Sequence, residues 1–255
     1  MTYPGAIHRD SGEEVKRQSL TADRLDFLFT TRPLPCPYLP EKIERKIVVA
    51  LADDRAGKDY KRLISAGYRR SGSIAYRHAC PTCRACVPVR LPIADFTPSK
   101  SLRRVARANN DLDVRILPPE ARADHFDLFT RYQDGRHGGG EMADMDYAEY
   151  LGLIEDSPVT TRIAEFRDSR GVLLAACLFD ELADSLSAVY TFFEPCMNKR
   201  SLGSFMILWL VKHGQENGKS DLYLGYWIGE CAKMAYKARF RPLEMLDRGV
   251  WRRML

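Results

Sequence analysis

The pattern of apolar and polar residues divides the chain into short segments that predict strands in both halves. Residues 71–79 and 87–96 alternate in the manner of half-buried strands, and a cysteine-rich turn joins them. In the second half, residues 160–168, 172–182 and 186–194 predict three consecutive strands separated by polar turns. The chain is therefore expected to contain sheet on both sides of its midpoint.

Helical spacing is clearest in residues 199–214. Leu202, Phe205, Met206 and Trp209 fall at positions i, i+3, i+4 and i+7, which predicts an amphipathic helix. We expect its apolar face, Trp209 included, to lie in the core. Shorter helices are predicted at 59–66, 98–107, 125–133, 147–154 and 231–240, further strands at 112–119 and 221–228, and a glycine-rich loop at 131–146.

The order of these elements predicts a mixed α+β protein. The second half reads as helix, three strands, helix, strand, helix and strand, which resembles the N-acyltransferase fold of the GNAT type. In that fold, amides at the start of a helix hold the phosphates of the acyl carrier, and Arg200 and Gly203 stand at the corresponding place. We expect a GNAT-like C-terminal domain at 108–255 and a smaller N-terminal α+β domain, basic and containing cysteines, at 1–107.

Composition is that of a protein with a folded core. The 255 residues are 45% hydrophobic and 29% charged, which is ordinary for globular proteins. The apolar runs are too short to cross a bilayer, and the first residues lack the apolar core of a signal peptide. Seven cysteines, an odd number, do not suggest a disulfide framework. These features predict a cytoplasmic protein without a membrane partner.

Positive charge is concentrated in two parts of the chain. Residues 61–107 carry a balance of +10 and residues 199–255 a balance of +6, whereas residues 108–198 carry a balance of −11. Charge asymmetry of this kind concerns partners rather than fold. The basic parts also contain aromatic residues, among them Tyr76 and Trp227, that suit stacking on unpaired bases.

One predicted helix carries much of this charge on a single face. Lys100, Arg103, Arg104 and Arg107 occupy positions i, i+3, i+4 and i+7. Like charges on one helix face repel one another, and a partner with dense negative charge offsets that repulsion. A nucleic acid backbone is such a partner, so the helix predicts an RNA-binding surface.

Three evenly spaced cysteines precede this helix. Cys80, Cys83 and Cys86 form a C-x2-C-x2-C motif, and Cys36 or His78 would supply a fourth ligand for zinc or an iron–sulfur cluster. The same spacing without a fixed fourth ligand also suits a protein that holds no metal. The sequence leaves both readings open, and we expect no cofactor to be required.

Taken together, the motifs resemble the aminoacyl-tRNA–protein transferases, most closely the bacterial aspartate/glutamate leucyltransferases and more distantly the eukaryotic arginyltransferases. The similarity implies transfer of leucine from leucyl-tRNA to the N-terminal α-amine of proteins that begin with Asp or Glu, which marks them for degradation by the N-end rule pathway. The eukaryotic relatives place a metal cluster on cysteines of the N-terminal domain, but Leu39 stands where their first cysteine pair would be completed. The matching segments keep their order and are 35–42, 68–112, 136–146, 186–195, 200–209 and 223–244.

The resemblance also implies a site. A GNAT-like core would receive the acyl group between two parting strands, expected here at 186–194 and 221–228. Tyr226 on the second strand and Glu194 at the end of the first are the catalytic candidates, although Tyr226 reads equally well as a core aromatic residue. No general base stands out. The tRNA-binding candidates are Lys100, Arg103, Arg104, Arg107, Arg200 and Gly203, and the candidates for the acceptor or the tRNA 3′ end are Arg77, Arg90, Gly225, Lys233, Tyr236 and Lys237.

Three other readings compete with this one. Arginine, rather than leucine, is the alternative donor. A GNAT enzyme that uses acyl-CoA would explain the helix that follows Arg200 but not the arginine-rich helix before it. An RNA-binding module without catalysis would explain the charge but not the order of strands.

Overall fold

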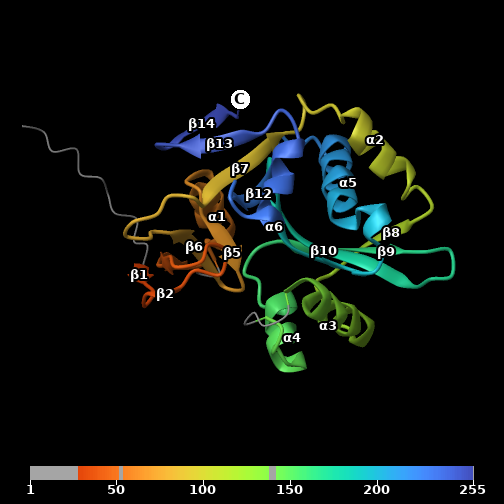
Figure 1. Ribbon diagram of the computed structural model, residues 1–255, viewed down its shortest axis with the longest axis horizontal. Helices are drawn as coiled ribbons and strands as arrows, with labels where there is room; N and C mark the ends of the chain where they lie inside the picture. Colours follow the sequence, from red (N-terminus) through yellow and green to blue (C-terminus); the bar gives the residue numbers. More distant parts are fainter. Residues whose placement is uncertain (1–27, 52–53, 138–141, 255) are drawn as a thin grey trace, which may run out of the picture.

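The fold was derived from a computed structural model, which describes residues 28–51, 54–137 and 142–254. Within these ranges the chain forms two main sheets with helices packed around them (Figure 1). The mixed α+β class expected from the sequence is confirmed. The helices are α1 (Ala56–Ser65), α2 (Lys100–Arg107), α3 (Ala123–His137), α4 (Tyr147–Glu155), α5 (Leu202–Glu216) and α6 (Ala232–Ala235), with 3-10 turns η1 (Asn198–Arg200) and η2 (Tyr236–Arg239).

The larger sheet has eight strands in the order β14-β13-β7-β12-β11-β10-β9-β8. The three central predicted strands form an antiparallel run β9-β10-β11, α5 follows, and β12 then returns parallel to β11. This succession is the GNAT-like order expected for the C-terminal half. The strands are β7 (Val87–Pro92), β8 (Asp113–Leu117), β9 (Thr161–Arg167), β10 (Leu173–Glu181), β11 (Ser185–Phe193), β12 (Asp221–Trp227), β13 (Glu244–Asp247) and β14 (Val250–Arg253).

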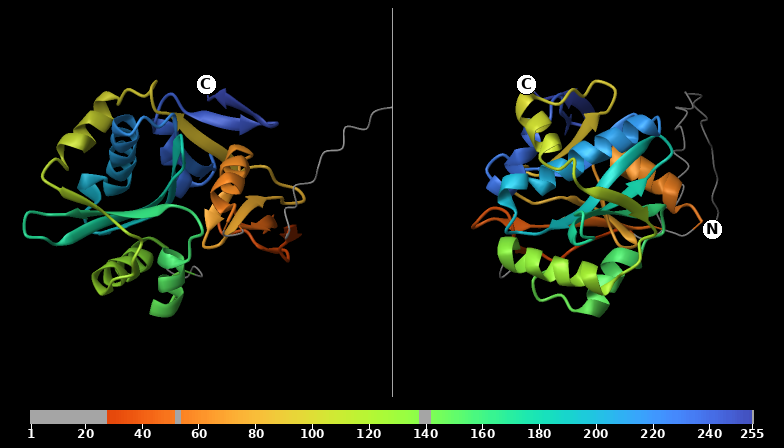
Figure 2. Two further views of the ribbon diagram at one scale, coloured as in Figure 1. Left: turned by 180° about the vertical axis from the view of Figure 1, so that it is seen from behind. Right: turned by 90° about the vertical axis from the view of Figure 1, so that its right-hand side faces the viewer.

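The smaller sheet has four strands in the order β1-β4-β6-β5 and lies at the end of the larger sheet where β11 and β12 begin to part. The two faces of the larger sheet are covered differently: α5 and α2 lie on one face, and α3 and α4 on the other (Figures 1 and 2). The smaller sheet and a further two-stranded pair are formed by β1 (Leu28–Thr30), β2 (Leu34–Pro35), β3 (Ile43–Glu44), β4 (Lys46–Ala50), β5 (Arg69–Ser71) and β6 (Ile74–His78).

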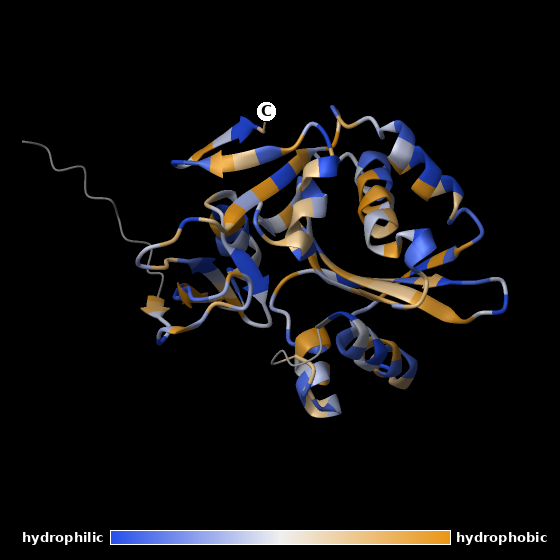
Figure 3. Cartoon of the chain, viewed as in Figure 1, coloured by the Kyte–Doolittle hydropathy of each residue, from blue (hydrophilic) through white to orange (hydrophobic). Residues whose placement is uncertain are grey.

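The core forms on both faces of the larger sheet, and its long strands are hydrophobic along most of their length (Figure 3). On the α5 face, Leu202, Met206 and Leu210 are fully buried, as their spacing predicts. Phe205 and Trp209, on the same face, pack against this core but are only partly buried, so the expected full burial of Trp209 was wrong. Its ring stacks on His213 at a centroid distance of 5.1 Å, at the margin of the core.

A buried ion pair joins the two sheets. Arg70 on β5 donates to both carboxylate oxygens of Asp180 on β10, at 2.9 and 2.7 Å, and also to Thr161 on β9. Both charged side chains are essentially inaccessible to solvent. A paired geometry of this kind holds β5 at a fixed position against the larger sheet, because removing either partner would leave a buried charge uncompensated.

Two details differ from the sequence expectations. The predicted loop at 131–146 begins too early, because α3 continues to His137; residues 138–141 lie outside the described part of the chain. The predicted helix at 231–240 is a short α6 that tightens into η2 at Tyr236. The boundary at 107/108 stays a prediction, and β7 and α2, which precede it, lie with the larger sheet. No helix of the described residues is both long and apolar enough to cross a membrane.

Candidate active site and tRNA interface

The candidate active site lies where β11 and β12 part. The two strands pair in parallel only at their beginnings, where Ser185–Ser187 of β11 lie beside Asp221–Tyr223 of β12. Beyond these pairs β11 stays with β10, while β12 bends toward β7 at an irregularity between Tyr223 and Gly225. Gly225 has a φ of +73°, a conformation that favours glycine. The opening between these strands, called the splay below, is where the sequence placed it.

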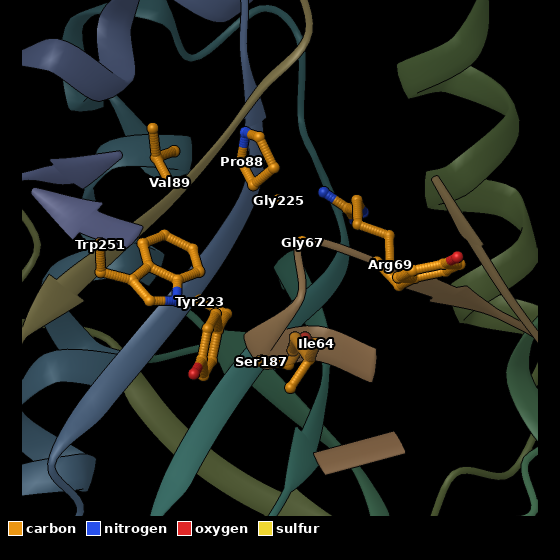
Figure 4. Close-up of a pocket in the computed structure, with 10 residues that line it drawn as sticks. Ile64, Gly67, Arg69, Pro88, Val89, Ser187, Tyr223, Gly225 and Trp251 are labelled. Carbon is orange, nitrogen blue, oxygen red and sulfur yellow. The ribbon is translucent and has the colours of Figure 1, made fainter. Parts of the chain in front are cut away.

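Arg69 of β5 enters the splay, and the sequence analysis did not single it out. Its Nη2 atom donates to the carbonyl oxygens of Ala188, at 3.4 Å, and Val189, both on β11. Its Nη1 atom lies so close to Gly225 that a Cβ there would be only 1.7 Å away. Gly225 is therefore glycine for two reasons, its backbone angle and the guanidinium beside it (Figure 4).

A second cation, Lys237, lies next to Arg69. Its side chain is only 5% exposed, and its Nζ atom donates to the backbone oxygen of Tyr226, with the Met234 Sδ atom 3.5 Å away. Burial, reinforced by the positive charge of Arg69, lowers the pKa of Lys237 to about 7. Lys237 and Gly225, both predicted site residues, are thus brought together with Arg69.

Tyr226 is a buried tyrosine whose hydroxyl is fully engaged. It donates to the backbone oxygens of Gly67, at 3.0 Å, and Tyr76, at 3.2 Å. Burial raises the pKa of Tyr226 well above its usual value, so the phenol stays neutral. These contacts favour a role in fixing the strands around the splay, which is the core reading that the sequence had left open. The catalytic role of Tyr226 stays a prediction.

Glu194 lies just beyond the end of β11. Its carboxylate accepts from the Arg131 side chain of α3 at 3.1 Å and from Cys196 Sγ at 3.3 Å. These partners belong to the α3 side of the sheet, whereas the groups around Tyr226 belong to the smaller sheet. Glu194 and Tyr226, the two catalytic candidates, therefore have no hydrogen-bond partner in common among the described residues.

The remaining acceptor candidates differ in their freedom to bind a ligand. Arg90 is held by Glu244, at 2.8 Å, and by Asp221, at 3.4 Å, and lies over the Trp251 ring. Arg77 and Lys233 are exposed, and Arg77 stacks over Tyr68. Tyr236 is partly buried, and burial raises its pKa to about 12. Among the described residues, Arg69 and Lys237 are the cations that face the splay without an acidic partner.

The face of α2 is open to solvent, as the spacing of its cations predicts. Lys100, Arg103, Arg104 and Arg107 are all exposed, while Leu102 on the opposite face is buried. Within the described ranges none of the four forms an ion pair; Arg103 donates to the Pro98 carbonyl at 2.6 Å. Their mutual repulsion is left uncompensated.

The same end of the molecule holds the start of α5. Asn109, buried just after α2, donates to the backbone oxygen of Arg200 at 2.8 Å and accepts from the Arg200 Nε atom at 3.0 Å. Arg200 also binds Asp111, so its side chain helps to fix α5 beside α2. Gly203, in the first turn of α5, packs against Phe193, where a Cβ would approach the ring to 3.2 Å. The predicted tRNA-binding residues thus form one region.

The cysteines of the predicted metal motif are neighbours but do not converge. Burial and the nearby thiols of Cys36, Cys80 and Cys83 raise the pKa of the Cys86 thiol to about 12. The Cys80 thiol points to the Arg45 carbonyl, and the Cys83 sulfur accepts from the Ala85 amide. In the part of the chain that is described, no three His, Cys, Asp or Glu side chains are placed to hold a metal ion. These residues, as placed, do not fit a metal or cluster.

His78 adjoins this cluster and is unusual for a buried histidine. Neither ring nitrogen has a hydrogen-bond partner among the described residues, and the nearest carboxylate, that of Glu44, is 3.9 Å away. Burial, together with the charges of Lys46 and Arg69, lowers the pKa of His78 to about 4. The ring is therefore neutral near pH 7 and packs edge-on against Tyr226 at a centroid distance of 4.7 Å.

Comparison with known proteins identifies the family. The family model described as "Arginine-tRNA-protein transferase, N terminus" matches residues 34–104, and the one described as "Arginine-tRNA-protein transferase, C terminus" matches residues 124–247. The aspartate/glutamate leucyltransferase of Paramagnetospirillum magneticum is 51% identical over 230 residues, which cover 90% of this chain and 94% of that protein. The protein of the same name from Rhodospirillum rubrum is 48% identical, with the same coverage of both chains.

Solved structures are similar at a lower level. The structure of L-PGS from Bacillus licheniformis has a TM-score of 0.45 and 14% identity, and the match covers 57% of this chain and 48% of that one. FemX has a TM-score of 0.43 and 9% identity, with coverage of 71% and 63%. The sequence matches span most of the chain and agree with the motifs quoted above, so the protein belongs to the aminoacyl-tRNA–protein transferase family, among the aspartate/glutamate leucyltransferases.

Proposed function

We propose that this enzyme transfers leucine from leucyl-tRNA to the N-terminal α-amine of cytoplasmic proteins that begin with Asp or Glu, and so marks them for degradation by the N-end rule pathway. The observation that carries the proposal is the combination of two features in one fold. One is an exposed basic helix, α2, beside the start of α5; the other is a splay that contains the partly buried Arg69 and the buried Lys237, neither with an acidic partner among the described residues. The first suits a tRNA, and the second suits an acidic acceptor.

The proposed reaction is aminolysis of an ester. The α-amine of the acceptor attacks the carbonyl carbon that links leucine to the 3′-terminal ribose, a C–N bond forms, the ester C–O bond breaks, and the amine proton ends on the ribose oxygen. An ester is already activated, so the enzyme contributes mainly by holding the two reactants together and excluding water. No step requires a cofactor.

The tRNA is proposed to lie across α2 and reach the splay with its 3′ end. The four exposed cations of α2 would contact phosphates, and Arg200, fixed by Asn109, holds the beginning of α5 beside them. Each phosphate contact contributes about 0.7–0.9 to the slope of log affinity against log salt. Binding through α2 therefore predicts a strongly salt-dependent affinity.

The direct test is an assay with defined donors and acceptors. The protein is incubated with leucyl-tRNA or arginyl-tRNA and with peptides that begin with Asp, Glu, Asn or Ala, and the products are read by mass spectrometry. The proposal expects leucine on the Asp and Glu peptides. Transfer of arginine alone would change the donor, transfer from acyl-CoA in place of tRNA would support the GNAT alternative, and no transfer from either tRNA would refute the proposal.

The tRNA surface is tested separately. Charge reversal of Arg103, Arg104 and Arg107 is expected to weaken tRNA binding and reduce the salt slope by about 2–3, because three phosphate contacts are lost. The matched control reverses three exposed cations of α1, which lies at the other end of the molecule: Lys58, Lys61 and Arg62. Unchanged tRNA affinity in the folded α2 variant, or equal losses in both variants, would exclude α2 as the docking surface.

A further inference from the structure

Arg69 carries a positive charge that no described residue neutralises. Its surroundings in the splay are tyrosines and backbone, and no described carboxylate forms an ion pair with it: Asp180 is paired with Arg70, and Glu44 with Lys46. A charge held inside a protein without an opposite charge is costly, and such groups are normally paired or bind a charged ligand. An unpaired guanidinium at the splay therefore points to an anionic ligand.

The tyrosines around Arg69 do not supply the missing negative charge. Burial raises the pKa of Tyr60 and of Tyr226 far above neutrality, so both phenols remain protonated. Their hydroxyls are also engaged: Tyr60 pairs with Ser187 at 3.1 Å, and Tyr226 donates to two backbone carbonyls. These contacts shape the walls of the splay and leave the charge of Arg69 in place.

The guanidinium also keeps hydrogen-bond donors free. Its Nη2 atom is used by Ala188 and Val189, whereas its Nε and Nη1 atoms donate to no other residue in the described ranges. Two adjacent N–H groups of a guanidinium match the two oxygens of a carboxylate. The absence of a side chain at Gly225 makes room for the Nη1 atom itself, and a cavity of about 10 Å³, enough for one water molecule, is lined by both residues (Figure 4).

We propose that Arg69 binds the side-chain carboxylate of the acceptor's N-terminal Asp or Glu, and that it is the residue that determines acceptor specificity. This inference rests on the proposed function. The carboxylate is favoured over a tRNA phosphate because the phosphate-binding cations of α2 lie at the far end of the sheet from β5, with α5 between them (Figures 1 and 2). Arg69, in contrast, is held by the strand that would flank the reacting groups.

The test compares two peptides that differ only in an N-terminal Asp or Asn. The unmodified enzyme is expected to prefer Asp, and Arg69→Gln is expected to reduce the Asp-to-Asn ratio of kcat/KM by about tenfold to a hundredfold, through loss of a charge-assisted bond. The tRNA affinity, which is assigned to α2, should stay close to that of the unmodified enzyme. The matched control is Arg170→Gln, an exposed arginine in the turn between β9 and β10, which should keep the full preference.

The outcomes separate the two proposals. If the unmodified enzyme fails to transfer leucine to Asp peptides, the proposed function fails, whatever the variants do. If it transfers leucine and Arg69→Gln keeps the Asp preference, or loses tRNA affinity instead, the role of Arg69 is refuted. Where a thermal melt shows that Arg69→Gln does not fold, Arg69→Lys replaces it. Lysine cannot bind both carboxylate oxygens as a guanidinium does, so KM should rise for the Asp peptide alone, and an unchanged KM refutes the inference.

Discussion

The buried Lys237 makes a prediction about stability that does not depend on any assay of activity. Its pKa is about 7 in the folded protein and 10.5 in the unfolded chain, because burial disfavours the charged form. Between these values the unfolded chain holds more protons than the folded protein, so the free energy of unfolding rises with pH. Below about pH 7 both states are protonated, and the cost of burying the charge is at its full value.

The magnitude follows from the two pKa values. Between pH 7 and about pH 9 the destabilisation caused by Lys237 falls by about 2 kcal/mol, since each pKa unit corresponds to about 1.4 kcal/mol and the folded lysine is half neutral at the start of this range. The side chain is 5% exposed, so solvent screening reduces this figure little. Lys237→Met removes the titrating group while keeping a similar length and volume.

Urea unfolding of both proteins at pH 7 and at about pH 9 provides the measurement. The stability of the unmodified protein relative to Lys237→Met should rise by about 2 kcal/mol over this range. The carbonyl of Tyr226, which loses its donor in the variant, shifts both measurements equally and cancels in the comparison. A stability difference that is the same at both pH values would show that Lys237 is solvated and that its place in the splay is wrong.

Three further predictions concern stability. Arg70→Ala should lower the free energy of unfolding by about 3–5 kcal/mol, because it leaves Asp180 buried and unpaired. Replacing Arg70 by Met and Asp180 by Leu together should recover most of this loss, and a loss under about 1 kcal/mol for Arg70→Ala in urea melts would contradict the prediction. The pKa of His78 is about 6.5 in the unfolded chain and about 4 in the folded protein, so the free energy of unfolding should fall by about 3 kcal/mol between pH 7 and pH 4. His78→Phe should remove this fall, and acid denaturation curves that are parallel for the two proteins would argue against it. Trp209→Ala should cost about 2–3 kcal/mol in a thermal melt, less than for a fully buried tryptophan, and a loss above about 4 kcal/mol would place it in the core after all.

Periodicity was enough to predict the elements whose role depends on a single face. The four cations of α2 repeat with the helical period, and a helix that carries them must expose them, so their position followed from spacing alone. The three antiparallel strands were equally clear. The partial exposure of Trp209 was not, because periodicity identifies a face but not how far the neighbouring elements extend over its edge.

The candidate site was less predictable because it depends on how neighbouring elements pack. Arg69 and Arg70 are adjacent and alike in sequence, but successive side chains of a strand point to opposite faces. One therefore meets Asp180, and the other enters the splay. The alternation of β5 was the available signal, but it does not say which face meets the splay.

The burial of Lys237 did not follow from its spacing, for a local reason. Spacing of four residues places Lys233 and Lys237 on the same face of an α-helix, and such lysines are usually solvated. The helix instead tightens to a 3-10 turn at Tyr236, which changes the angle between successive side chains. Lys233 consequently remains exposed while Lys237 is buried.

The place of β7 in the larger sheet has a consequence for how this protein is made on the ribosome. This strand is synthesised early, yet both its neighbours, β12 and β13, come from the last part of the chain: Pro92 pairs with Asp221 and Val89 with Met245. At about 5–20 residues per second, its unpaired edges and apolar side chains wait on the order of 10 s for their partners. The sheet can close only when translation is nearly complete. A chain whose synthesis stops after α5 therefore keeps β7 with unpaired edges and exposed apolar side chains, which favour aggregation.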